Sequence, residues 1–429
     1  MTNKIYARVI EWAYENIFGE KISLKTLIFL KSLKYVIFGY GIAGFCVFVF
    51  EILCGRILGP NEYGKFVLVN SVGMFLYFFM TMGVTTAAVK YNAEKEEYNR
   101  QQKIISTSYW FILIISFTLV LLFFIFSPLF SKFFSIPLLI SRLSIIFAFF
   151  YTLYLLVVDS LRGLHQFKKL AIFRATYGFL ILIIFILFLL NNYLSFKTAV
   201  FAICLAYLII FSMITVSIRS YLSFEIDKIW LKNLLEYGIY AAGGSFLFVF
   251  LPTLSKIMVN KYLTVADVGI YNAYYFSSLN ITLFFYNVFI TVFFPTASKY
   301  QQKAPILKKI KKLIPFMFLI GTPLLFVSQL IVLNFYGPKY PINYFLMFLF
   351  ALSGILFLIY GFYSWLFFSK GIKEVRLIVI LITIMFLINV FLSIYFIPRL
   401  SFSGAVLAIL LTYLTGVICL FFSQKKLIE

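Results

Sequence analysis

Long apolar runs are the feature that most constrains what this chain can fold into. They recur along the sequence, and each is close to the roughly 20 residues that a helix needs to cross the hydrocarbon of a membrane. Hydrophobic residues make up 63% of the chain and charged residues 12%. A water-soluble fold has about 25% charged residues, so this chain could not cover its apolar surface in water. We predict an all-α integral membrane protein with twelve transmembrane helices.

The predicted helices follow the apolar runs directly. They are residues 34–53, 66–89, 104–127, 142–160, 172–190, 199–218, 238–258, 270–293, 313–334, 344–367, 376–397 and 403–423.

Basic residues are distributed unevenly over this map. The chain has 37 Lys and Arg against 15 Asp and Glu, a net charge of +22. If twelve helices alternate in direction, 28 of the 37 basic residues fall on the side of the two termini. Cytoplasmic loops carry such an excess, so we predict that both termini are cytoplasmic. The excess needs no nucleic-acid partner, and attraction to anionic membrane lipids is its secondary effect.

One short segment occurs twice, about half a chain apart. Residues 56–64 read R-I-L-G-P-N-E-Y-G, and residues 261–269, at an offset of 205, read K-Y-L-T-V-A-D-V-G. Each copy joins two apolar runs. Many transporters consist of two similar halves with the substrate path between them. We therefore predict two pseudo-symmetric six-helix bundles around a central cavity.

Four segments follow from this division. They are a cytoplasmic leader at 1–30 that could form an interfacial helix, an N-terminal lobe at 31–218, a cytoplasmic linker at 219–236 and a C-terminal lobe at 237–429.

Several function classes lack their sequence signals. The chain has no G-x-x-x-x-G-K-[ST] segment for a nucleotide, and its one histidine, His165, has no carboxylate or cysteine at metal spacing. The loops between the predicted helices are short, which leaves little room for the reaction site of an enzyme. We expect no catalytic residue, cofactor or metal.

Polar residues within the apolar runs mark a candidate pathway, because polar groups facing lipid are costly. Three asparagines of the run 270–293 fall within about 80° at 100° per residue, and a tyrosine borders them. The run 66–89 has a similar stripe. The candidates are Asn272, Tyr275, Asn280 and Asn287 in one run and Asn70, Tyr77 and Thr81 in the other. Amide and hydroxyl groups suit the passage of sugars, and bonding between neighbouring helices is the equal alternative.

Charged residues at the ends of the runs are the second set of candidates. Lys256 and Glu51 occupy equivalent places in the two halves. Basic residues at the inner ends could bind a phosphate group or extend to the interface. The cationic candidates are Lys256, Arg162, Arg174 and Lys90, and the candidates for coupling to an ion are Glu51 and Asp159.

Several segments together resemble the polysaccharide (O-antigen type) flippases, often called Wzx, of the multidrug/oligosaccharidyl-lipid/polysaccharide exporter superfamily. The resemblance covers most of the chain, and it rests on the order and spacing of short pieces. These are R-I-L-G-P-N-E-Y-G at 56–64, L-R-G-L-H-Q-F at 161–167, V-G-I-Y at 268–271, F-P at 294–295, N-F-Y-G-P-K-Y at 334–340, K-G-I-K at 370–373 and S-G-A at 403–405. The family often has an acidic residue before a basic one late in its seventh helix, where this chain has Ser255 and Lys256.

The resemblance implies a multi-pass protein of the bacterial inner membrane. It implies that the protein moves undecaprenyl-diphosphate-linked oligosaccharide units from the inner to the outer leaflet by alternating access, and that a glycan polymerase and export machinery are its partners. A drug/cation antiporter of the same superfamily is the alternative, and it predicts acidic residues deep within the lobes. A membrane glycan polymerase or ligase is a third possibility, which the short loops disfavour.

Overall fold

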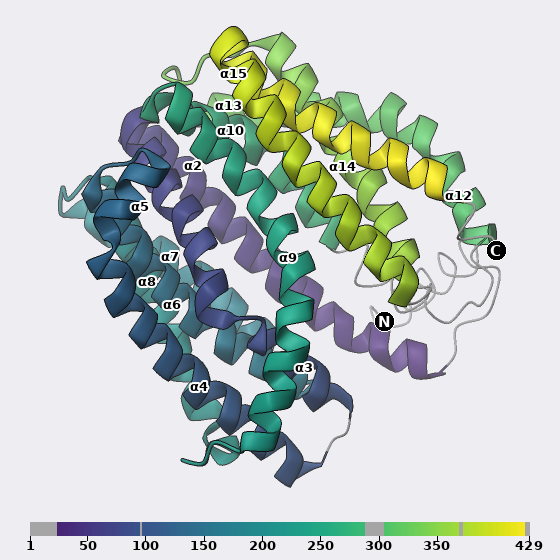
Figure 1. Ribbon diagram of the computed structural model, residues 1–429. Helices are drawn as coiled ribbons and strands as arrows, with labels where there is room; N and C mark the ends of the chain where they lie inside the picture. Colours follow the sequence, from purple (N-terminus) through teal and green to yellow (C-terminus); the bar gives the residue numbers. More distant parts are fainter. Residues whose placement is uncertain (1–23, 95–96, 288–303, 369–371, 425–429) are drawn as a thin grey trace, which may run out of the picture.

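The computed structural model describes residues 24–94, 97–287, 304–368 and 372–424, and all secondary structure in these ranges is helical (Figure 1). Residues 1–23 of the predicted leader lie outside the described residues. The predicted all-α architecture is confirmed.

The helices of the first half include one very long element. They are α2 (Leu24–Thr81), α3 (Val84–Glu94), α4 (Tyr98–Ile125), α5 (Ser127–Phe134), α6 (Leu138–Gly163), α7 (Phe167–Leu190) and α8 (Phe196–Ser217), followed by the 3₁₀ turn η1 (Arg219–Tyr221).

The second half contains two π-helical turns. Its elements are α9 (Lys228–Tyr262), α10 (Val265–Tyr275), the π turn η2 (Phe276–Asn280), α12 (Ala304–Phe316), the π turn η3 (Met317–Gly321), α13 (Thr322–Tyr336), α14 (Tyr344–Phe368) and α15 (Ile372–Ser423).

Eight helices among the described residues are long and apolar enough to cross a membrane. One of them, Arg376–Ser423, contains two of the predicted runs, and another, Phe38–Thr81, contains most of the runs 34–53 and 66–89. Many large apolar side chains point outward, such as Phe133 at 73% and Leu319 at 75% exposure. Such a surface requires lipid rather than water around it, so this is a multi-pass membrane protein. The number twelve and the division into lobes stay predictions.

Residues with positive φ separate runs that are helical on both sides. Gly59 (φ 74°) bends α2 directly before Pro60, and Ser401 (φ 51°) bends α15. A third break, at Met82 (φ 47°) and Gly83 (φ 72°), divides the predicted run 66–89 between α2 and α3. The prediction of one uninterrupted helix there was wrong, because left-handed backbone cannot continue a right-handed helix.

The predicted linker is shorter than expected, since residues 228–236 already belong to α9. Asp227 begins this helix by accepting hydrogen bonds from the amides of Trp230 (3.1 Å) and Ile229 (3.0 Å). These amides, Trp230 first, together with Lys103, lower the pKa of the Asp227 carboxyl. The preceding residues are attached to α4, where the Trp110 indole donates to the carbonyl of Ser223 (2.7 Å).

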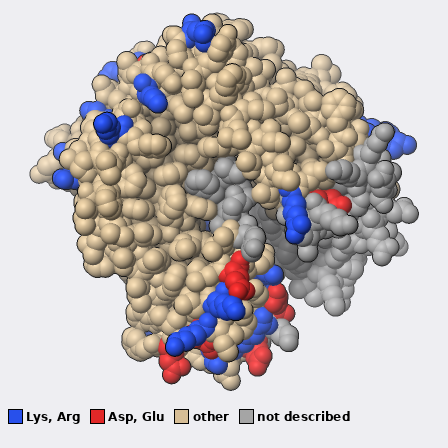
Figure 2. All heavy atoms as spheres, viewed as in Figure 1, with Lys and Arg blue, Asp and Glu red and all other residues tan. Residues whose placement is uncertain are grey.

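The helices gather in two groups that meet at one end and part towards the other (Figure 1). Helices α4 to α8 form one group with most of α2, and α10 to α15 form the other. Helix α2 packs against α6 and α7 of its own group and against α10 of the other, while α9 packs against α15 and α3. The surface is hollowed where the groups part (Figure 2).

The two copies of the repeated turn lie against each other where the groups meet. A Cβ atom added to Gly64 would come 1.9 Å from the carbonyl oxygen of Val265, and one added to Gly269 would come 2.2 Å from that of Pro60. At the offset of 205 residues, Val265 corresponds to Pro60 and Gly269 to Gly64. The contact is therefore reciprocal, and both glycines are needed for the backbones to approach this closely.

We expect Gly64→Ala to lower the free energy of unfolding by about 1–3 kcal/mol, the usual cost of overpacking. The obstacle is backbone, which cannot rotate away as a side chain can. Thermal unfolding of the purified protein in detergent measures the effect. Gly41→Ala is the matched control, because nothing lies within 4 Å of a Cβ added there. Equal melting temperatures for the two variants would contradict the close contact.

Candidate functional site

A buried hydrogen-bond network joins α2, α10 and α13 near the repeated turns. The hydroxyl of Tyr63 donates to Oε2 of Glu51 (2.6 Å), and Nδ2 of Asn272 donates to the Tyr63 oxygen (2.7 Å). The hydroxyl of Tyr336 lies 3.1 Å from the same oxygen. A tyrosine hydroxyl has one hydrogen to donate. Because Tyr63 donates it to Glu51, the Tyr63 oxygen accepts the hydrogen bonds from Asn272 and Tyr336. Tyr63 thus connects three helices through one atom.

Asn272 belongs to this network. The sequence left it open whether this asparagine lines a path or bonds a neighbouring helix. Its side chain is buried, with 5% exposure, and bonds Tyr63 across the α10–α2 interface. For this residue the structure supports the packing alternative.

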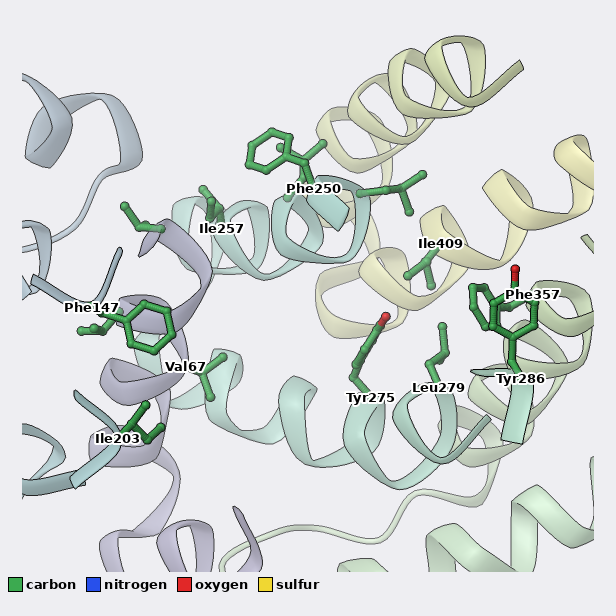
Figure 3. Close-up of a cluster of buried hydrophobic side chains, with 14 of the residues drawn as sticks. Val67, Phe147, Ile203, Phe250, Ile257, Tyr275, Leu279, Tyr286, Phe357 and Ile409 are labelled. Atoms are coloured by element: carbon green, nitrogen blue, oxygen red, sulfur yellow. The ribbon is translucent and has the colours of Figure 1, made fainter. Parts of the chain in front are cut away.

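Lys256 lies on α9 beside the same region and is partly exposed. Its Nζ lies 4.9 Å from the centroid of the Tyr275 ring, a distance typical of a cation–π contact. In Figure 3, Tyr275 rises from α10 towards the space between the helices that carry Ile257 and Ile409. The charge of Glu51 acts on Lys256, yet no carboxylate in the described part of the chain lies within 4.0 Å of its Nζ.

A second polar group lies at the other end of the first group of helices. Nη1 of Arg162 forms an ion pair with Oδ1 of Asp159 (3.2 Å), and 44% of the Arg162 side chain remains exposed. The guanidinium of Arg174 stacks on the ring of Tyr40, at 4.2 Å from its centroid. Nε of Arg174 is buried and has no hydrogen-bond partner among the described residues. The Tyr40 hydroxyl also interacts with Arg162, so the structure brings both predicted arginines to one tyrosine.

Tyrosines from α2, α6, α7 and α8 pack around this pair of arginines. Tyr77 contacts Tyr151 edge-on with ring centroids 5.0 Å apart, and Tyr177 stacks on Tyr207 at 5.2 Å and 3°. Tyr154 lies 4.8 Å from Tyr207. Only Tyr77 was predicted. The others recur in the runs 142–160, 172–190 and 199–218, and this repetition was the available sequence signal.

Lys90 contacts α9 and its own helix. Its Nζ lies 3.9 Å from the centroid of the Tyr237 ring on α9 and 4.0 Å from a carboxylate oxygen of Glu94. A role of Lys90 in binding a phosphate group stays a prediction.

The predicted asparagine stripe does not stay on one face. Asn280 is partly buried and Asn287 is exposed, whereas Asn272 is buried. The π turn η2 (276–280) follows Asn272 and ends at Asn280, and each π turn contains more residues than an α turn. The rotation of 100° per residue that predicted the stripe therefore does not hold across it.

The predicted stripe on α2 contains one unsatisfied group. The Thr81 hydroxyl donates within its own helix to the carbonyl of Phe78 (3.3 Å). Oδ1 of Asn70 is buried without a hydrogen-bond partner in the described part of the chain. A buried polar atom without a partner is unusual, so Asn70 is the stripe residue best placed to bond a ligand or water.

We expect Tyr63→Phe to lower the free energy of unfolding by about 1–3 kcal/mol, because Asn272 and Glu51 lose their shared partner in a buried site. Tyr193→Phe is the matched control, since Tyr193 is 66% exposed. Thermal unfolding in detergent compares the two variants. Equal stabilities would show that the network does not hold α2, α10 and α13 together.

Comparison with known families identifies the family of this chain. Residues 53–341 match the family model described as polysaccharide biosynthesis protein. The chain belongs to this family. Among proteins with curated descriptions, none matches the sequence.

Solved structures share the fold at low sequence identity. An inward-facing multidrug resistance MATE family transporter of the MOP superfamily is similar with a TM-score of 0.73 and 13% identity, over 91% of this chain and 95% of that one. The outward-facing conformation of such a transporter is similar with a TM-score of 0.59 and 12% identity, over 95% of this chain and 99% of that one. A MOP superfamily transporter from Pyrococcus furiosus is similar with a TM-score of 0.60 and 12% identity, over 94% of this chain and 97% of that one. That transporter is described as having a binding pocket of reversed polarity. The chain thus belongs to a polysaccharide biosynthesis family and shares its fold with solved transporters of the MOP superfamily.

Proposed function

We propose that this protein is a flippase that moves undecaprenyl-diphosphate-linked oligosaccharide units from the inner to the outer leaflet of the bacterial plasma membrane. Lys256 carries the proposal, because this cation lies among membrane-spanning helices without a carboxylate within 4.0 Å in the described residues. A charge in such a place is costly and is typically functional. The diphosphate of a lipid-linked glycan would complement it.

The arginine pair supplies a second contact for the same group. Arg162 is half exposed and Arg174 has an unused buried donor, and guanidinium groups bind phosphate through forked hydrogen bonds. The surrounding tyrosines offer hydroxyls and aromatic faces to sugars. A glycan needs such partners, because each hydroxyl buried without a hydrogen bond costs several kcal/mol.

The shape supports entry of the cargo from the cytoplasmic side. The helices match the inward-facing transporter with a TM-score of 0.73 and the outward-facing one with 0.59. The repeated turns and the Tyr63 network would close the outer end, and the hollow in Figure 2 would open to the cytoplasm. Both termini then lie in the cytoplasm, as the basic residues predict. Outward movement of negative charge would gain about 2.3 kcal/mol per charge per 100 mV.

A drug/cation antiporter is the second candidate, favoured by the fold of the multidrug transporters. It needs a carboxylate that is free to bind a cation or a proton. Asp159 is paired with Arg162, and Glu51 accepts from Tyr63. Both stay candidates for coupling to an ion, and their bonded state favours an anionic cargo. Glycan polymerase and export machinery are the partners that we propose for such a flippase.

Reconstitution in vesicles with a defined lipid-linked oligosaccharide tests the proposal. We expect the wild type to move this lipid between leaflets and Lys256→Ala to slow the movement by about tenfold or more, since one lost charged contact is worth about 1.5–3 kcal/mol. Lys261→Ala is the matched control, because Lys261 is exposed and contacts the ring of Tyr262 instead. Transport of cationic drugs without transport of the glycolipid would favour the antiporter.

Asn70→Leu separates a pathway role from a packing role. Because Oδ1 has no partner to lose among the described residues, we expect the free energy of unfolding to stay within about 0.5 kcal/mol of the wild type, as for most substitutions without such a loss. The rate of glycolipid transport should fall several-fold. A destabilised variant with wild-type transport would assign Asn70 to helix packing.

A further inference from the structure

Four lysines cover one face of α12, at positions 308, 309, 311 and 312, and all four are exposed. We refer to them as the α12 lysine face. At 100° per residue they occupy one side of the helix, while Ile306, Leu307 and Ile310 are buried on the other. In the sequence, these lysines are distinguished only as part of the basic excess. The structure shows that they form a continuous surface.

The lysine face borders a surface that requires lipid. Directly after it, apolar side chains are exposed from the end of α12 through η3 into α13, among them Phe316 at 59%, Leu319 at 75% and Leu324 at 64%. Nζ of Lys311 lies 5.5 Å from the centroid of the Phe421 ring, whose side chain is also 47% exposed on α15. The lysines therefore lie where the lipid-facing surface ends, at the depth of the headgroups.

The position at the edge of the molecule leaves this face accessible. Helix α12 lies at the right-hand margin of Figure 1, and Figure 2 shows basic side chains at that margin. The helix continues directly into η3, and its main packing partner among the other helices is α14.

Three of the four lysines of this face lack a nearby counter-charge in the described part of the chain. Among the described residues, no carboxylate lies within 4.0 Å of Lys308, Lys311 or Lys312. The charged end of α3, α4 and α9 differs, because Lys103 pairs with Asp227 there and Lys232 with Glu236. The like charges at positions 308, 311 and 312 attract anions from outside.

We propose that the α12 lysine face is a binding surface for the headgroups of anionic phospholipids in the cytoplasmic leaflet. The lysines sit at headgroup depth, where phospholipid phosphates greatly outnumber any lipid-linked cargo. Each lysine near an anionic bilayer contributes about 1 kcal/mol, which corresponds to about fivefold in affinity. The surface is separate from Lys256 and the arginines, and its role does not depend on the identity of the cargo.

The test compares two variants of the full-length protein that lose the same charge. One is K308Q/K309Q/K311Q/K312Q, and the control, at the other charged end, is K103Q/R219Q/K228Q/K232Q. Binding of phosphatidylglycerol, with phosphatidylcholine as the reference lipid, is measured by native mass spectrometry of the detergent-solubilised protein. We expect the first variant to bind phosphatidylglycerol at least tenfold more weakly than the wild type and the control to change less than twofold.

Farnesyl diphosphate as a second probe distinguishes the source of the phosphate. If the α12 variant lost the binding of farnesyl diphosphate but bound phosphatidylglycerol as the wild type does, the proposal would be overturned in favour of cargo capture. Equal losses of phosphatidylglycerol in both quadruple variants would also overturn it, because net charge alone would then explain binding. Wild-type thermal stability of the α12 variant confirms that a loss of binding does not arise from unfolding.

Discussion

The close contact between the two repeated turns is the constraint on which the rest of this structure depends. Because Gly64 and Gly269 have no side chains, the backbones of α2 and α10 approach until an added Cβ atom would reach the opposite carbonyl. This contact holds the two groups of helices together at one end. It also places Tyr63, one residue before Gly64, within hydrogen-bonding distance of Asn272. One end is thereby closed by backbone packing and by a buried polar network.

In this conformation the groups of helices part at the opposite end (Figure 1). The cationic candidates lie at different distances from that opening. Lys256 lies near the closed end, beside Tyr275. Arg162 and Arg174 lie at the far end of the first group, around Tyr40. In the proposed transport, an anionic group would first meet the arginines and then the lysine. The tyrosines of α6, α7 and α8 would contact the sugars on the same side of the path.

Sequence reasoning succeeded where a single helix determines the outcome. Apolar runs of about 20 residues predicted helices that the structure contains, because hydrophobicity and length are properties of a segment alone. It failed where local backbone geometry changes the register. The break at Met82 and Gly83 and the π turn at 276–280 have no clear signal in a run of apolar residues, and each one rotates the side chains that follow.

By itself, the sequence determined that this chain is a helical membrane protein. Backbone exposed to lipid is so costly that only helices and closed barrels span a membrane, and the apolar runs are continuous rather than alternating as in a barrel strand. Only the tertiary structure decided what the polar residues do. Asn272 and Asn70 have the same side chain in equivalent predicted stripes, yet one bonds Tyr63 and the other keeps a buried acceptor without a partner among the described residues. A hydrogen bond depends on which atoms of distant segments come within about 3 Å, and the packing of the helices fixes that distance.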